Sequence, residues 1–224
     1  MKRWPLLLLT RASGVALASS CPDGDQLLQN NTPLADLCPR GFGQFHPQSI
    51  GQAIKDQQSN AKMIVAAAQD GGVPVDLALA VSYHESEGFN SCAGSDTGVK
   101  GPMQLTQATG RSYGYNRDVN EQNVKGGMAA LKSAVDKCGG ATDFTCLARY
   151  YNGSPRPGEQ AGWARGVQRD YGELQSNPAL AASACSDVQA CPVGPGGFDP
   201  AKPVAGGAAA PSGPADLTLP ASAG

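Results

Sequence analysis

A mainly α-helical fold with a disordered C-terminal tail is predicted by three features of the sequence. Apolar residues recur every three or four positions over several long segments between residues 50 and 174, a spacing that gathers them on one helix face. No segment alternates apolar and polar residues over the length expected of a strand. Beyond Pro192 the chain is rich in Pro, Gly and Ala and poor in core-forming residues, which predicts a disordered tail over 192–224.

The first 21 residues are expected to be an export leader. Two basic residues precede an apolar run that ends in small residues before Cys21, as in a signal peptide. Residues 18–21 also resemble a bacterial lipoprotein processing site, which makes Cys21 a candidate for lipidation. Arg11 interrupts the only apolar stretch that could span a membrane, so no spanning helix is expected. Residues 22–47, rich in Pro, Asn and Gly, are expected to be irregular.

Helices are predicted along the rest of the chain until a Cys-containing extension at 177–191. Pairs of glycines at 71–72 and 139–140 are expected to end the first and the fourth helix. The fourth and last helices carry the clearest apolar stripes, and we expect these stripes, Trp163 among them, to form the core. The predicted helices span residues 50–69, 75–87, 106–113, 121–138, 142–151 and 159–174.

Charge and cysteine content narrow the class of protein. A formal charge of −2 over 224 residues does not indicate nucleic-acid binding. Seven cysteines indicate an oxidising compartment, and with only two histidines and no C-x-x-C motif they do not indicate zinc. If Cys21 is lipidated or removed, six cysteines remain. We expect Cys138 to pair with Cys146 across a Gly-Gly turn, and Cys185–Cys191 and Cys38–Cys92 then follow by elimination, although sequence alone allows 15 pairings.

Glu85 is the candidate catalytic acid. It lies at the end of the helix predicted over 75–87, on the same face as Leu77 and Val81. Apolar surroundings raise the pKa of a carboxyl group, so such a group can stay protonated near neutral pH and act as a proton donor. Glu87 points away from Glu85 and is the weaker candidate. A solvated helix end without a catalytic role is the alternative.

Motifs that follow Glu85 carry a family resemblance. Ser86 and Phe89 come first, and a last motif reads Tyr150-Tyr151-Asn152-Gly153. Together the motifs resemble the catalytic domain of the soluble-type (SLT) lytic transglycosylases of the lysozyme-like superfamily, over about half of the chain. The sequence departs from that family by one extra residue before Phe89 and by Pro102 in place of Leu, which removes a backbone donor. The motifs in between are the run Ser95-Asp96-Thr97-Gly98-Val99-Lys100-Gly101-Pro102-Met103-Gln104, the helix start Leu105-Thr106-Gln107-Ala108-Thr109, and the spaced residues Asp118, Asn123 and Gly127.

The resemblance implies a helical, lysozyme-like domain of SLT or goose type over residues 48–176, and it assigns roles to six residues. Glu85 would be the catalytic acid and base. Ser95 and Gln104 would hold the N-acetyl group of the substrate, and Met103 would lie at the cleft wall, although core packing is the alternative for its side chain. Tyr151 would hold the acid or the intermediate with its hydroxyl, and Asn152 would brace its loop.

The implied reaction cleaves the β-1,4 bond between MurNAc and GlcNAc in peptidoglycan and forms a 1,6-anhydro-muramyl product. No second carboxylate stands out, and one acid suffices where the substrate's acetamide stabilises the cation. No cofactor and no metal are implied. A hydrolytic muramidase or endolysin on the same fold is the alternative, and a non-catalytic glycan-binding wall protein is the third hypothesis.

The expected partners are peptidoglycan glycan strands. We expect a monomer in the periplasm or cell envelope, with no nucleic-acid partner and with membrane attachment only through a lipid on Cys21. Among lytic transglycosylases, a small domain with cysteines and a Pro-rich tail resembles specialised members that open the wall for a secretion or conjugation apparatus, which would then be an envelope partner.

Overall fold

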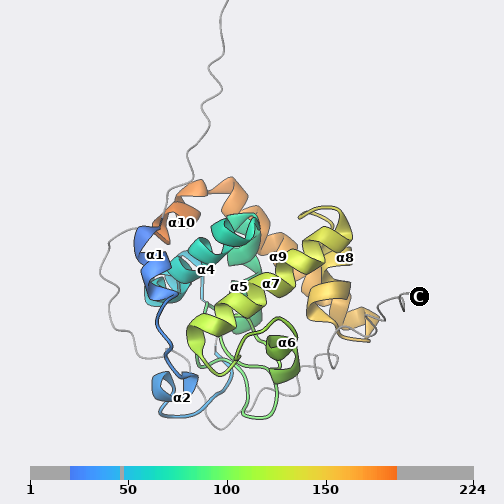
Figure 1. Ribbon diagram of the computed structural model, residues 1–224. Coiled ribbons are helices and arrows are strands. Elements are labelled where there is room, and N and C mark those ends of the chain that lie inside the picture. Colours follow the sequence, from blue (N-terminus) through green and yellow to red (C-terminus); the bar gives the residue numbers. More distant parts are fainter. Residues whose placement is uncertain (1–20, 46–47, 186–224) are drawn as a thin grey trace, which may run out of the picture.

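The computed structural model describes residues 21–45 and 48–185, and within them the fold is helical without any extended strand, as predicted (Figure 1). Residues 1–20 of the leader expected over 1–21, the tail expected over 192–224 and the candidate partner Cys191 lie outside the described residues. The elements are α1 (Pro22–Leu27), α2 (Leu34–Leu37), α3 (Ile50–Asp56), α4 (Gln58–Gly71), α5 (Val75–Ser86), α6 (Gln107–Ser112), α7 (Asn120–Cys138), α8 (Phe144–Leu147), the π-helical turn η1 (Ala148–Asn152), α9 (Pro157–Ser176) and α10 (Pro178–Ser183).

Helix α5 lies at the centre of the core. Residues 77–82 on this helix are all buried, so the helix is covered on every side rather than on one stripe. It packs mainly against α9 and α4, while α4 also contacts α1 and α7. Helix packing alone therefore positions the C-terminal end of α5, which carries Glu85.

The helix predicted over 50–69 is two helices in the structure. The chain breaks at Gln57, whose φ of −121° and ψ of 39° are not helical, and α4 starts directly afterwards. Apolar spacing continues across the break because both helices face the same core, so the pattern gives no sign of it. The two glycine stops are confirmed: α4 ends at Gly71 before a left-handed Gly72, and α7 ends before a left-handed Gly139.

Three short helices lie where the sequence predicted irregular chain or only an extension. Helices α1 and α2 fall within residues 22–47, and α10 falls within 177–191. Each spans no more than six residues, too few turns for a helical period to be detected in the sequence. Buried Leu28 and Leu34 attach the N-terminal segment to the rest of the molecule.

Three disulfides link the described residues. The expected pairs Cys38–Cys92 and Cys138–Cys146 are confirmed. The expected pair Cys185–Cys191 is wrong, because Cys185 bonds to Cys21, and Cys21 is 3% exposed within the core. The elimination failed because it set Cys21 aside as leader or lipid site. A lipid thioether on Cys21 would require this disulfide to be absent.

None of the helices in the described part of the chain combines the length and the apolar character needed to cross a membrane.

Candidate active site

Glu85 lies in the last turn of α5, half-buried, with its carboxylate held by α9. The indole Nε1 of Trp163 donates a hydrogen bond of 2.7 Å to Oε1 of Glu85. Trp163 is buried, and a buried indole N–H needs an acceptor, which Glu85 supplies here. No other hydrogen bond joins the Glu85 carboxylate to the residues described, so Oε2 remains available to a ligand.

Burial raises the pKa of Glu85, because removing the carboxylate from water disfavours its charged form. Nearby His84 and the hydrogen bond from Trp163 act in the opposite direction, since both favour the carboxylate. Burial is the largest of these effects. The side chain is therefore suited to hold a proton at a pH where an exposed glutamate has lost it, as the sequence predicted for a general acid.

The chain turns sharply just after Glu85. Glu87, Gly88 and Phe89 all have positive φ, and the Phe89 side chain is fully buried. The carboxylate of Glu87 accepts a 2.8 Å hydrogen bond from the backbone N–H of Phe45, so Glu87 holds a neighbouring segment and is engaged outside the site.

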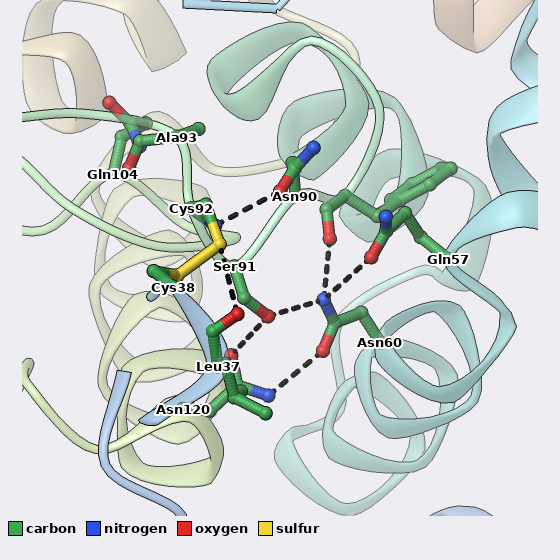
Figure 2. Close-up of a disulfide and its surroundings, with 11 residues drawn as sticks. Leu37, Cys38, Gln57, Asn60, Asn90, Ser91, Cys92, Ala93, Gln104 and Asn120 are labelled. Carbon is green, nitrogen blue, oxygen red and sulfur yellow. Dashed lines mark hydrogen bonds between the residues drawn. A yellow bond between two sulfur atoms is a disulfide. The ribbon is translucent and has the colours of Figure 1, made fainter. Parts of the chain in front are cut away.

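A buried polar network fixes the same turn from behind (Figure 2). The amide of Asn60 donates to the carbonyl of Phe89 at 2.6 Å and to the hydroxyl of Ser91 at 2.8 Å. Ser91 donates to Asn120, whose amide donates back to Asn60 at 2.9 Å. The adjacent Cys92 is bonded to Cys38. Helices α4 and α7 and a disulfide thus set the path of the loop that leaves α5, the helix of the candidate acid.

Gln104 and Ser95 brace the Ser/Gly-rich loop, which covers residues 87–106 between α5 and α6. The side-chain amide of Gln104 donates to the carbonyls of Ala93 and Gly101, at 2.9 and 2.8 Å, and uses both of its N–H groups there. Only its oxygen is left to meet a ligand. The hydroxyl of Ser95 accepts a 2.9 Å bond from the backbone N–H of Gly98, which closes a tight turn. Their expected contacts with an acetamide remain predictions.

Met103 requires a correction. Its side chain is 0% exposed and belongs to the core, so it does not form part of a cleft wall. A close approach of α7 explains this position, because Gly127 of α7 lies so near that any side chain at residue 127 would overlap Met103. Asn123 accepts from the N–H of Met103 at 3.0 Å and donates to the carbonyls of Lys100 and Arg117. The spaced Asn and Gly of the sequence motif therefore anchor the loop to α7.

Tyr151 lies next to Trp163, with ring centroids 5.9 Å apart, but its hydroxyl donates to the carbonyl of Met103 at 3.1 Å and not to Glu85. Burial, together with the nearby charges of Glu85 and Tyr113, raises the pKa of Tyr151 well above its ordinary value, so the hydroxyl stays protonated. Asn152 accepts from the N–H of Ser154 and so braces its loop, as predicted.

Sequence reasoning missed Trp163 as a site residue. Its place on an apolar stripe predicted a core side chain, and it is in the core, yet its polar N–H points at Glu85. The signal that could have drawn attention to it is general: an indole N–H in a core needs an acceptor, although the sequence does not say which acceptor it meets. No group of three or more potential metal ligands occurs in the described part of the chain.

Replacing Tyr151 by Phe should test whether this side chain serves the site or only packing. The change removes one hydrogen bond to the Met103 carbonyl and should cost about 1 kcal/mol of unfolding free energy. Loss of the anchored loop position should lower the lytic rate by about tenfold or more. Gln104→Ala should act in the same direction, because it removes both braces of the loop.

The matched control for these two variants is Tyr171→Phe, since Tyr171 packs on Phe144 and has no bond to the site. Denaturant melts and turbidity loss of peptidoglycan suspensions would be measured together. Variants of Tyr151 and Gln104 that lose stability but keep the specific activity of the folded fraction would contradict the site role.

Parts of the chain are similar to known proteins. Residues 62–169 match the family described as "Transglycosylase SLT domain". A stretch of 59 residues, 26% of this chain, is 42% identical to "Membrane-bound lytic murein transglycosylase F" of Shewanella sp. (strain ANA-3). Proteins of the same name from Shewanella sp. (strain MR-4) and from Shewanella oneidensis match over the same length. The chain spans only 12% of the length of each of these relatives.

Proposed function

We propose that the protein is a murein lytic transglycosylase of lysozyme-like fold, on the premise that residues 62–169 match the transglycosylase SLT domain. It would cleave the β-1,4 bond between MurNAc and GlcNAc and leave a 1,6-anhydro-muramyl end. The observation that carries the proposal is the single half-buried carboxyl of Glu85, whose pKa burial raises and whose Oε2 is open to a ligand.

The other acids near α5 are engaged elsewhere. Glu87 accepts from the Phe45 backbone, and buried Asp170 is bonded to Arg169. Asp96, on the Ser/Gly-rich loop, has an 81% exposed side chain that pairs with Lys100. A glycosidase with two carboxylates needs both of them facing the scissile bond. The engagement of these acids supports a one-carboxyl reaction.

In that reaction Glu85 performs two proton transfers. As a neutral acid it gives its proton to the glycosidic oxygen, and the C–O bond to the leaving sugar breaks while the substrate's acetamide stabilises the positive charge. As a carboxylate it then accepts the proton of the 6-hydroxyl of the muramyl sugar. The 6-oxygen attacks the anomeric carbon and closes the anhydro ring. Glu85 ends protonated, as it began, and no water is consumed.

A hydrolytic muramidase on the same scaffold is the alternative, and the products separate the two. Purified sacculi would be digested with the protein, and the released muropeptides analysed by mass spectrometry. Transglycosylase products are lighter by one water than the hydrolysis products of the same glycan. Fully hydrated reducing ends would contradict our proposal and favour the muramidase, whereas the absence of any released muropeptide would favour a glycan-binding wall protein.

We further propose that the protein acts outside the cytoplasm, on glycan strands in the cell envelope. Three disulfides among the described residues support an oxidising compartment. Opening the wall for a secretion or conjugation apparatus is the narrower proposal, supported by the small size of the domain. A knockout that loses assembly of such an apparatus, and regains it with active protein but not with Glu85→Gln, would test it.

A further inference from the structure

Behind Glu85, the described structure contains a group of side chains that the proposed reaction does not use. His84 lies edge-on to the ring of Trp163, with centroids 6.2 Å apart and planes at 90°. On its other side, Nδ1 of His84 lies 3.7 Å from Oδ2 of Asp170. A continuous series of contacts therefore runs from Asp170 through His84 to Trp163, and from the indole N–H to Glu85.

Asp170 is 2% exposed, and its two oxygens have different surroundings. Oδ1 accepts a 2.8 Å bond from Nε of Arg169 and lies 2.7 Å from its Nη2. Oδ2 is buried and has no hydrogen-bond partner. A buried carboxylate oxygen without a hydrogen-bond partner is costly. The imidazole of His84 faces this oxygen at 3.7 Å, so the contact between them is electrostatic rather than a hydrogen bond. This contact gives the His84 ring a preferred place.

Gly166 gives the same ring the space that it needs. It lies on α9 between Trp163 and Asp170, and a methyl group at this position would overlap the imidazole atoms of His84. Helix interiors disfavour glycine by roughly 1 kcal/mol relative to alanine. Of the four glycines on α9, Gly166 is the one at which a Cβ would meet another residue. About two turns of α9 thus carry the indole, the gap and the carboxylate that together seat His84 against Trp163.

We propose that Trp163 is a positioning residue for the catalytic carboxyl, and that His84, seated by Asp170 and Gly166, holds the indole in place. The inference deepens the proposed function and rests on it. The indole N–H reserves Oε1 of Glu85 as an acceptor, which leaves Oε2 as the oxygen that exchanges the proton with substrate.

This division of the two oxygens suits both halves of the reaction. While Glu85 is neutral, Oε1 is the carbonyl oxygen that accepts from Trp163, and the proton on Oε2 can go to the glycosidic oxygen. While it is a carboxylate, the same N–H stabilises the charge, and Oε2 can receive the proton of the 6-hydroxyl. The carboxyl group keeps one orientation throughout, which avoids the cost of reorienting it between the steps.

Trp163→Phe is the main test, because it keeps an aromatic ring and removes the N–H. We expect kcat to fall by about 10²-fold with KM little changed, since the group that aims Glu85 is lost and no substrate contact is. The pH profile should change as well. The N–H favours the carboxylate, so its loss should raise the pKa of Glu85 further and move the alkaline limb of kcat to higher pH.

Other titratable and charged groups lie near this site, and their contribution to the pH profile should be the same in all variants that keep them. They are His84 on α5, Tyr151 on η1, Arg169 and Asp170 on α9, and Tyr113 after α6. The control Leu174→Ala removes buried volume from the same helix at a distance from Glu85. It should lower Tm and leave both kcat and the alkaline limb of the folded enzyme unchanged. A Trp163→Phe enzyme that behaves like this control would overturn the proposal.

Gly166→Ala tests the seat of His84 without removing any polar group. It should favour the helix and displace the imidazole, so we expect a lower kcat in a folded protein. His84→Gln is the second variant, and it should lower kcat in the same direction whether or not Gly166→Ala folds well. Full activity of His84→Gln would show that His84 has no such role.

A spectroscopic measurement separates this inference from the function on which it rests. The full chain contains two tryptophans, at positions 4 and 163, so its indole N–H region in a nitrogen–proton NMR spectrum is simple, and Trp163→Phe assigns the signals. The Trp163 signal should shift as Glu85 titrates, and this shift should vanish in Glu85→Gln. A shift without anhydro products would overturn the function and keep the indole contact. Anhydro products without the shift would overturn the positioning role alone.

Discussion

Glu85→Gln is expected to abolish lytic activity, lowering the rate by a factor of about 10²–10⁴, the usual contribution of a general acid. The amide keeps the shape of the side chain, and its oxygen can still accept from Trp163, but it cannot supply a proton to the glycosidic oxygen. Turbidity assays and release of muropeptides from purified sacculi would measure the loss. Glu87→Gln is the matched control, and it should stay active because its carboxylate binds the Phe45 backbone.

The Glu85→Gln variant should fold at least as well as the natural protein at neutral pH. Because folding raises the pKa of Glu85, the native state binds a proton more tightly than the unfolded chain does. The stability associated with that proton is complete below the unfolded pKa near 4.5 and is lost as the pH rises through the raised native value. Above that pH window the ionised carboxylate destabilises the folded state, and the neutral amide of Gln does not. Activity within a few-fold of the natural enzyme would disprove the assignment.

Removing the Cys21–Cys185 disulfide should cause the largest loss of stability. The bond joins residues 164 positions apart, and the chain-entropy relation gives about 5 kcal/mol for a loop of that length. This is comparable to the whole free energy of unfolding of many domains. The double variant Cys21→Ser with Cys185→Ser would be compared with the natural protein by denaturant unfolding under non-reducing conditions.

The control is the pair Cys138→Ser with Cys146→Ser, because that bond spans only 8 positions and the same relation gives about 2.5 kcal/mol. Both double variants lose two sulfurs and gain two hydroxyls. Cys21→Ser also places a hydroxyl at a buried position, so the longer loop and the buried hydroxyl both favour a larger loss in that variant. Equal losses of unfolding free energy in the two variants would show that loop entropy does not govern the stability of this protein.

Sequence was sufficient for features that repeat with the helical period or end at a glycine. The helix that carries Glu85, and the glycine stops of α4 and α7, follow from local rules that tertiary structure did not override. The helical fold class and the position of Glu85 near the end of its helix were predictable for this reason, and the role of Glu85 as the acid stays a prediction. The break at Gln57 was not, because α3 and α4 face the same core and the apolar spacing continues through it.

The side chains around the acid depended on contacts between distant segments. Trp163 meets Glu85 across 78 positions of sequence, and periodicity identified only the apolar face of each of their two helices. Met103 resembles a ligand contact by motif, but its burial is decided by the close approach of Gly127 on another helix. Such placements are properties of packing, which one sequence records only as residue sizes and polarity.

The bond between Cys21 and Cys185 also turns the folded unit into a closed covalent ring, with the other two disulfides lying within it. A protease that cuts one peptide bond anywhere between these residues opens the ring without releasing a fragment. The nicked protein would keep its mass, apart from one added water, and would migrate as one species until a reductant separated the pieces. An enzyme built in this way can survive a cut in an exposed loop, such as the turn at 139–140, with its helices still tethered to one another.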